Sequence, residues 1–309
     1  MENKYFTNKK YVAFFAILCS ILWGSAFPAL KVSYSELNIQ TADTMGRIIF
    51  AGMRFFIASL IIFTVYKLTI KKSIKIKKKE AFNAFKLGLL QTALFYFFFY
   101  TGLAHTTGVK GSILDSGCTF FVILLAHFAY KNDKISTKKI IGLILGFTGI
   151  ICASWKKGFT FNFVFTGDGF ILFSGFIFGL STIYAKKLST NLHPILLTAW
   201  QMFLGSLVLL TIGIIGSKGI HLVFTPKAKW LLLYTSLVSS VAVSLWYSLL
   251  KYNKAGEISL YKFVNPLAGS ILSALFIPGE AFNVYVILAL VLVSAGIIVV
   301  NYTPHTKKI

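Results

Sequence analysis

Three charged residues lie inside otherwise apolar stretches of this sequence: Arg54, Asp115 and Lys262. A charge near the centre of a bilayer costs about 2.5–3.5 kcal/mol on insertion scales, so each is a functional candidate by default. An ammonium and a carboxylate on one cavity suit a zwitterion, with Lys262 holding a substrate carboxylate and Asp115 an amino group. Asp115 is also the candidate proton-coupling site, because burial favours the protonated form of a carboxyl group. The alternatives are a structural ion pair between the two residues, or separate extension of each side chain to water.

Other residues of the same stretches are candidate substrate ligands or cavity walls. Asn265 precedes Pro266, where a kink in a helix frees a backbone carbonyl, so Asn265 is a third candidate ligand. Four aromatic residues are candidate walls, although packing or interfacial belts are the competing interpretation for each ring: Trp23, Tyr100, Trp246 and Tyr247. For Arg54 we expect a structural role, either extending outward or pairing with Asp43 or Glu36.

The composition indicates a membrane protein. Of the 309 residues, 56% are hydrophobic and 13% are charged, where soluble domains carry about 25% charged residues. The mean hydropathy is +0.76. A net charge of +22 would suggest nucleic acid in a soluble protein. Here the basic residues fill short gaps between apolar runs, as in cytoplasmic loops, so we expect membrane lipids and not nucleic acid as the surroundings.

Ten apolar segments follow one another along the chain, most of them close to the roughly 20 residues that span a bilayer as a helix. They are continuous and lack the alternation of a membrane β-barrel, so the predicted fold class is all-α integral membrane. The first follows Lys9 and Lys10 like a signal peptide but is too long for one, so we interpret it as an uncleaved helix. The segments are 11–31, 46–66, 82–104, 108–130, 138–155, 167–186, 194–216, 229–250, 257–277 and 283–302.

The positions of the basic residues predict the orientation. If the N-terminus is cytoplasmic, the inner segments hold 21 Lys and Arg residues and the outer segments hold 8. Cytoplasmic loops carry the excess of Lys and Arg. We therefore predict a multi-pass protein of the plasma (inner) membrane with both termini in the cytoplasm.

A weak internal repeat divides the predicted helices into two halves, residues 1–155 and 156–309. In a register of 147 residues, Arg54 falls on Gln201, Tyr100 on Tyr247 and Asp115 on Lys262. Five spans in each half invert the second half relative to the first. Inverted repeats around a central midplane site are a recurring architecture of secondary transporters, which indicates transport by alternating access.

Three stretches resemble the drug/metabolite transporter superfamily, in its EamA branch. They are Leu-Trp-Gly-Ser-Ala-Phe-Pro-Ala-Leu-Lys (22–31), Met-Arg-Phe-Phe-Ile-Ala-Ser-Leu (53–60), and Tyr-Lys-Phe-Val-Asn-Pro-Leu-Ala-Gly (261–269) followed by Gly279-Glu280. The resemblance implies ten helices as two inverted five-helix repeats around a central cavity, and export of amino acids or related metabolites. The chain departs from the family pattern at Thr119, where proline is frequent, and at Asp133, where glutamate is.

The remaining expectations concern chemistry and partners. Histidines and cysteines do not cluster with metal-ligand spacing, and no phosphate loop or nucleophile motif is present, so we expect no metal, no cofactor and no enzymatic activity. The expected partners are a small-molecule substrate, an amino acid or small organic solute, and membrane lipids, with the chain as a monomer or homodimer. The alternatives are an integral membrane enzyme or lipid-handling protein, and a membrane receptor or scaffold that does not transport.

Overall fold

The structure, a computed structural model, describes residues 2–40, 43–106, 108–154, 163–217, 222–277 and 284–301, and all regular elements in them are helical. Helices overlap each of the ten predicted apolar segments. The first half contains α1 (Glu2–Thr7), α2 (Lys9–Glu36), α3 (Thr44–Val65), η1 (Tyr66–Ile70), α4 (Lys78–Gly88), η2 (Leu89–Leu94), α5 (Phe95–Ala104), α6 (Gly108–Ser116), α7 (Cys118–Ala129) and α8 (Thr137–Ser154). The second contains η3 (Phe165–Gly169), α9 (Phe170–Leu188), α10 (Pro194–Gly216), α11 (Pro226–Tyr252), α12 (Ala255–Ser259), η4 (Leu260–Phe263), α13 (Val264–Phe276) and α14 (Val284–Asn301).

The described residues form a multi-pass membrane bundle. Eight helical segments in them are long and apolar enough to cross a bilayer, and a shorter apolar helix covers Tyr285–Asn301. Large apolar side chains stay exposed on the sides of the bundle, among them Phe128, Ile215 and Leu275. Exposed apolar surface on this scale is expected where lipid, not water, surrounds the helices. The motif residues Gly279 and Glu280 lie outside the described residues.

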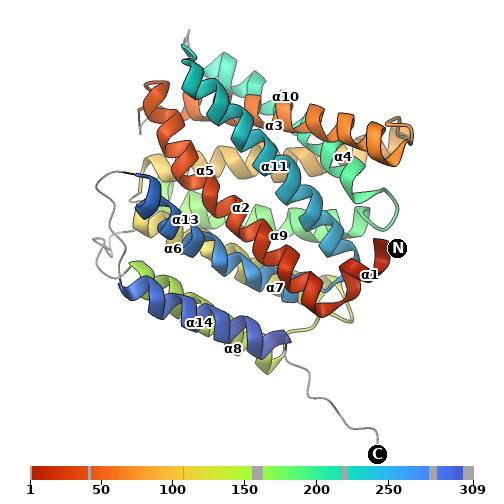
Figure 1. The fold of residues 1–309 in the computed structure, drawn as a ribbon, viewed down its shortest axis with the longest axis vertical. Helices are drawn as coiled ribbons and strands as arrows, with labels where there is room; N and C mark the ends of the chain where they lie inside the picture. Colours follow the sequence, from red (N-terminus) through yellow and green to blue (C-terminus); the bar gives the residue numbers. More distant parts are fainter. Residues whose placement is uncertain are drawn as a thin grey trace, which may run out of the picture.

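The helices run side by side across the molecule (Figure 1). Helix α3 packs along α10 at one edge and α8 packs along α14 at the opposite edge, while α2 packs on α11 and α13 between them. Glycines permit these close approaches. A Cβ atom on Gly142 of α8 would lie 3.2 Å from the carbonyl oxygen of Gly296 in α14, and one on Gly24 of α2 would lie 2.6 Å from the Cβ of Ala268 in α13.

Two helical segments are interrupted near the middle of the bundle. Gly117 separates α6 from α7, and the 3₁₀ segment η4 separates α12 from α13. The segment around η4 is held from outside, because Ser20 of α2 donates to the Tyr261 carbonyl at 2.9 Å and Thr119 of α7 to the Ser259 carbonyl at 3.3 Å. Hydroxyl groups thereby satisfy carbonyls at the edge of an interrupted helix, which a lipid environment requires.

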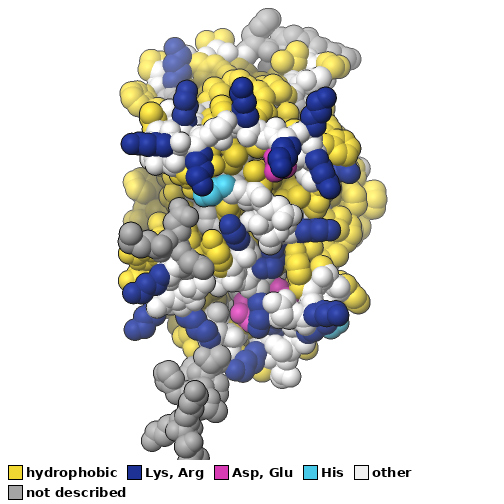
Figure 2. All heavy atoms as spheres, turned by 90° about the vertical axis from the view of Figure 1, so that its right-hand side faces the viewer, with side chains coloured by type: hydrophobic (Ala, Val, Ile, Leu, Met, Phe, Trp, Pro, Cys, Tyr) yellow, Lys and Arg dark blue, Asp and Glu magenta, His cyan; other side chains and the backbone are white. Residues whose placement is uncertain are grey.

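The end of the bundle that carries α1 is strongly basic (Figure 2). The segment from η1 to α4 alone contributes eight exposed lysines: Lys67, Lys71, Lys72, Lys75, Lys77, Lys78, Lys79 and Lys86. This is the charge expected of a face toward the cytoplasm and anionic lipid. The orientation itself remains a prediction.

Candidate functional site

A central cavity of about 110 Å³ lies between the helices of both halves. Its three charged wall residues are Arg54, Asp115 and Lys262, the three charges that the sequence places inside apolar stretches. Its other walls are mainly aromatic and apolar: Trp23, Ala26, Phe27, Leu30, Phe55, Gln91, Phe95, Tyr96, Phe99, Tyr100, Phe178, Val238, Ser239, Val243 and Asn265. Five of the seven predicted substrate-binding residues line one cavity, and their role in binding remains a prediction.

The Lys262 ammonium lies in η4 among uncharged neighbours. Its Nζ donates to Cys118 Sγ at 3.2 Å and lies 3.4 Å from the centre of the Phe178 ring and 5.9 Å from that of the Trp23 ring. Aromatic faces attract cations, but more weakly in total than a paired carboxylate. The ammonium is therefore held in place without being neutralised.

The Asp115 carboxylate lies in the last turn of α6 and is near enough to Lys262 for the two charges to interact. In the described chain, however, no ion pair joins them, and the Asp115 Oδ1 atom is buried without a hydrogen-bond partner. Buried polar atoms are nearly always hydrogen-bonded in folded proteins, so an atom on a cavity wall that has no partner within the protein is available to a molecule in the cavity. The structural ion pair that the sequence left open is not formed, and neither charge faces lipid.

Arg54 of α3 also lies on the cavity wall, where the sequence reasoning did not place it. Its guanidinium lies 4.3 Å from the Phe55 ring centre and 5.4 Å from the Tyr96 ring centre, and its Nε is buried without a partner. The expected pairing with Asp43 or Glu36 is wrong, because both carboxylates are engaged elsewhere. The Asp43 side chain caps α3 through the Gly46 N–H at 2.9 Å, and Glu36 pairs with Lys227 at 2.9 Å.

Asn265 and Tyr100 lie on the wall as predicted, from α13 and α5. The Asn265 Oδ1 atom is buried and has no hydrogen-bond partner. Its backbone is close to α2, since a Cβ atom on Gly24 would lie 2.9 Å from the Asn265 carbonyl oxygen. The first turn of α13 is therefore fixed against α2, and the Asn265 side chain adds a third orphan polar atom to the cavity.

Trp246 and Tyr247 of α11 are absent from the wall of this cavity. Both are 2% exposed and lie in the apolar core, where the Trp246 ring packs edge-on against the cavity residue Trp23 with the ring centres 5.1 Å apart. Trp246 therefore supports the wall from behind. The repeat register pairs Tyr100 with Tyr247, but only Tyr100 lines the cavity.

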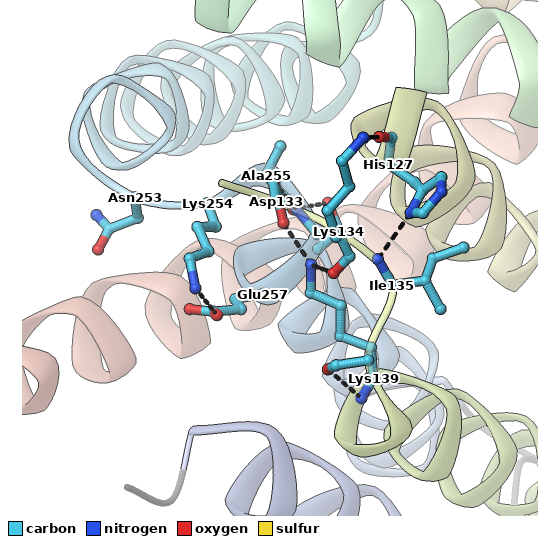
Figure 3. Close-up of polar contacts among 12 residues, drawn as sticks. His127, Asp133, Lys134, Ile135, Lys139, Asn253, Lys254, Ala255 and Glu257 are labelled. Atoms are coloured by element: carbon cyan, nitrogen blue, oxygen red, sulfur yellow. Dashed lines mark hydrogen bonds and ion pairs between the residues drawn. The ribbon is translucent and has the colours of Figure 1, made fainter. Parts of the chain in front are cut away.

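Two aspartate or glutamate side chains at the basic end are paired with lysines instead (Figure 3). Asp133, after α7, binds Lys139 of α8 at 2.5 Å and accepts from the Gly256 N–H of α12 at 3.0 Å. The side chains of Asp133 and Lys139 are almost fully buried. Beside them, the exposed Lys254 binds Glu257 at 2.9 Å. This network ties the segment after α7 to α12, across the two halves.

The opposite end of the bundle has a similar pair. Asp168 of η3 binds Lys110 of α6 at 2.5 Å, and it also accepts from the Thr106 hydroxyl at 2.7 Å and the Val164 N–H at 2.8 Å. Buried charges that are paired and hydrogen-bonded in this way fix the positions of helix ends. Buried ion pairs thus lie at both ends of the bundle, whereas the cavity charges Arg54, Asp115 and Lys262 form no ion pair among the described residues.

A many-helix membrane bundle with a polar, partly aromatic cavity at its centre is the architecture of a solute transporter. The sequence model of the EamA-like transporter family matches residues 10–155 and again 165–302. The chain therefore belongs to the EamA-like transporter family, in agreement with its resemblance to the drug/metabolite transporter superfamily.

Several relatives along nearly the whole chain are named as uncharacterized transporters. The uncharacterized transporter YoaV of Bacillus subtilis is 22% identical over 95% of this chain and 97% of its own length. An uncharacterized transporter of Archaeoglobus fulgidus is 24% identical over 93% and 96%. A chloroplastic WAT1-related protein of Arabidopsis thaliana is 24% identical over 91% of this chain and 67% of its own length. One solved crystal structure shares the fold, with a TM-score of 0.75 at 12% identity over 94% of this chain and 97% of that one.

Proposed function

We propose that this protein is a secondary active transporter that exports amino acids or related small metabolites across the plasma (inner) membrane by alternating access. In this proposal residues 1–155 and 156–309 are inverted five-helix repeats, both termini are cytoplasmic, and the ten predicted segments all span the membrane. The observation that carries the proposal is the central cavity, where Asp115 and Lys262 face one space without an ion pair between them.

The two charges have complementary roles toward a zwitterion. Lys262 holds the substrate carboxylate, since its ammonium has no carboxylate partner among the described residues and can give a charge-assisted hydrogen bond. The Asp115 carboxylate accepts hydrogen bonds from the substrate ammonium group. When no substrate is bound, Asp115 exchanges a proton. Asn265 and Tyr100 supply further polar contacts, and the Trp23 ring closes one side against Trp246.

Several features of the fold support alternating access. The two elements that carry Asp115 and Lys262 are each interrupted, at Gly117 and at η4, and discontinuous helices form the substrate sites of many transporters. The packing of α3 on α10 and of α8 on α14 pairs elements that occupy equivalent places in the two proposed repeats. Rocking of one half against the other around the cavity would then expose it to each side of the membrane in turn.

The test is counterflow by the purified protein in proteoliposomes, against a panel of amino acids and small organic acids, with a pH gradient imposed. We expect exchange of at least one amino acid-like solute. Lys262→Ala should abolish it, whereas Lys254→Ala, which alters an exposed lysine at the basic end, is the matched control. Absence of exchange for every solute would contradict transport, and full exchange with unchanged affinity in Lys262→Ala would remove the carboxylate anchor.

The proton role of Asp115 is tested by Asp115→Asn in the same assay. The amide cannot exchange a proton, so exchange by this variant should no longer respond to the imposed pH gradient. Glu257→Gln is the comparison, because Glu257 is a partly exposed carboxylate paired with Lys254 at the basic end. A pH response that persists in Asp115→Asn would exclude Asp115 as the coupling site.

A further inference from the structure

The charges on the cavity wall do not balance. Two are cationic, Arg54 and Lys262, and one is anionic, Asp115. Six carboxylates elsewhere in the described chain are engaged outside the cavity. Four of them bind lysines, Glu36 to Lys227, Asp133 to Lys139, Asp168 to Lys110 and Glu257 to Lys254, while Asp43 and Glu80 accept from backbone N–H groups. With all three side chains ionised, the wall therefore carries one positive charge more than it carries negative charges.

Aromatic rings, and not carboxylates, surround the additional cation. Arg54 is 4% exposed, and its guanidinium lies over the faces of Phe55 and Tyr96. Tyr96 is also a hydrogen-bond partner of the guanidinium, whereas the Arg54 Nε atom is buried without one. A charge removed from water requires a counter-charge as well as hydrogen bonds, and no carboxylate pairs with Arg54 among the described residues.

We propose that the transported solute carries a net negative charge, with two acidic groups and one amino group, and that Arg54 is the second acid anchor. This inference rests on the proposed transport function. Lys262 binds one acidic group, Asp115 the amino group, and the planar fork of Arg54 binds the other acidic group through two parallel hydrogen bonds. The bound solute then neutralises the wall, since its charge of minus one offsets the excess.

The geometry of the wall fits three points of attachment. Arg54 comes from α3, Asp115 from α6 and Lys262 from η4, so the three charged groups approach the cavity from different helices. Tyr96 lies within electrostatic range of both Arg54 and Asp115, which places these two on a shared part of the wall. One water molecule needs about 10–15 Å³ of a cavity measured in this way. The cavity of about 110 Å³ therefore has room for roughly seven to eleven water-sized groups, which suits a solute the size of aspartate.

The test compares three small probes in counterflow: L-aspartate, L-asparagine and succinate. Asparagine has nearly the shape of aspartate with one acidic group fewer, and succinate lacks the amino group. We expect a KM for aspartate at least about tenfold lower than that for asparagine, as the loss of a charge-assisted hydrogen bond predicts. Succinate should be exchanged less well than aspartate because Asp115 then faces no amino group.

Variants of Arg54 assign the preference to its charge and shape. Arg54→Gln should bring the ratio of the KM for asparagine to the KM for aspartate close to one. Arg54→Lys should retain part of the preference for aspartate. The matched control is Arg47→Gln, which removes a buried arginine of the same helix that lies against Tyr34 and outside the cavity, and it should keep the ratio of the wild type. A preference for aspartate that survives in Arg54→Gln would overturn the assignment.

A second readout does not depend on the folding of any variant. Aspartate should raise the unfolding temperature of the wild-type protein in detergent more than asparagine does at equal concentration, because a ligand stabilises the state that it binds. Exchange of asparagine equal to that of aspartate, or an equal thermal shift, overturns the charge inference and leaves transport intact. No exchange of any of the three probes overturns the substrate class, while no exchange across the wider amino-acid panel overturns transport as well.

Discussion

Two aspartate–lysine couples of this protein are built from the same side chains in opposite arrangements. At the basic end, Asp133 and Lys139 form an ion pair of 2.5 Å, and the Gly256 N–H adds a hydrogen bond. In the central cavity, Asp115 and Lys262 interact only at longer range, and the Asp115 Oδ1 atom has no partner. Asp133 and Lys139 are 1% and 2% exposed, whereas Lys262 is 9% exposed and Asp115 is partly buried on the cavity wall.

The difference indicates what each couple is for. A buried ion pair with its hydrogen bonds satisfied holds two chain segments in one arrangement, and removing one partner leaves an uncompensated charge. An aspartate and a lysine that are held too far apart to form an ion pair can each bind an opposite charge of another molecule. We therefore assign Asp133 and Lys139 to the fold, and Asp115 and Lys262 to the solute.

Breaking the paired couple should give the largest loss of stability. Asp133→Asn leaves the buried Lys139 without its counter-charge, which we expect to lower the free energy of unfolding by about 3–5 kcal/mol. That corresponds to a fall of roughly 6–20 °C in the unfolding temperature of the protein in detergent, followed by tryptophan fluorescence. The double variant Asp133→Asn, Lys139→Met should recover part of the loss. A single variant as stable as the wild type would contradict a structural role.

Removing the Lys262 ammonium from the cavity should reduce transport without reducing stability. Lys262→Met breaks no ion pair and removes a buried charge that interacts with Asp115 only at longer range, so the unfolding temperature should stay close to that of the wild type or rise. Counterflow of the solute should fall by about tenfold or more, because one charge-assisted hydrogen bond is lost. A variant that loses stability as Asp133→Asn does, while its folded fraction still transports, would show that Lys262 belongs to the fold.

The edge of the cavity is tested by a smaller change. The Tyr247 hydroxyl is buried without a partner and lies away from the wall. Tyr247→Phe should therefore raise the free energy of unfolding by about 1 kcal/mol and leave the KM of the solute unchanged. Tyr100→Phe, the change at the repeat-related residue on the wall, is the comparison, and we expect it to raise the KM. An equal KM effect of both substitutions would place Tyr247 in the site after all.

The smallest effect is expected at the exposed pair of the basic end. Lys254 and Glu257 bind at 2.9 Å with exposed fractions of 45% and 32%, and exposed pairs contribute only about 0–1 kcal/mol. The hydrogen bond to Glu257 raises the pKa of Lys254 above the ordinary 10.5. The contribution is therefore complete at neutral pH and is lost only as the pH rises through that raised pKa. Lys254→Met should change the unfolding temperature at pH 7 by at most a few degrees.

The membrane fold could be predicted because its signal is local. A helix in lipid needs an unbroken apolar run, and helices of the structure overlap every apolar segment of the sequence. The register of 147 residues also connected Asp115 with Lys262, which lie on one cavity wall although they are far apart in the chain. Eight helical segments of the described chain are long and apolar enough to cross the membrane. That the other predicted segments also cross it stays a prediction.

The faces of the individual helices could not be predicted. Trp246 and Tyr247 lie on a helix that carries six serine and threonine residues, of which only Ser239 lines the cavity, so the polar residues of this helix did not mark its cavity face. For Arg54 the sequence predicted a structural role, either extending outward or pairing with Asp43 or Glu36, whereas the structure places it on the central wall. One signal was available, since the same register pairs Arg54 with Gln201, a second buried polar residue in an apolar helix.

The measurement that tests the assignment most directly is the thermal shift caused by the solute that counterflow identifies. The solute should raise the unfolding temperature of the wild type and of the double variant Asp133→Asn, Lys139→Met by the same amount, and it should not stabilise Lys262→Met. Equal stabilisation of Lys262→Met and the wild type would contradict the account, because the unpaired ammonium of the cavity would then have no part in binding.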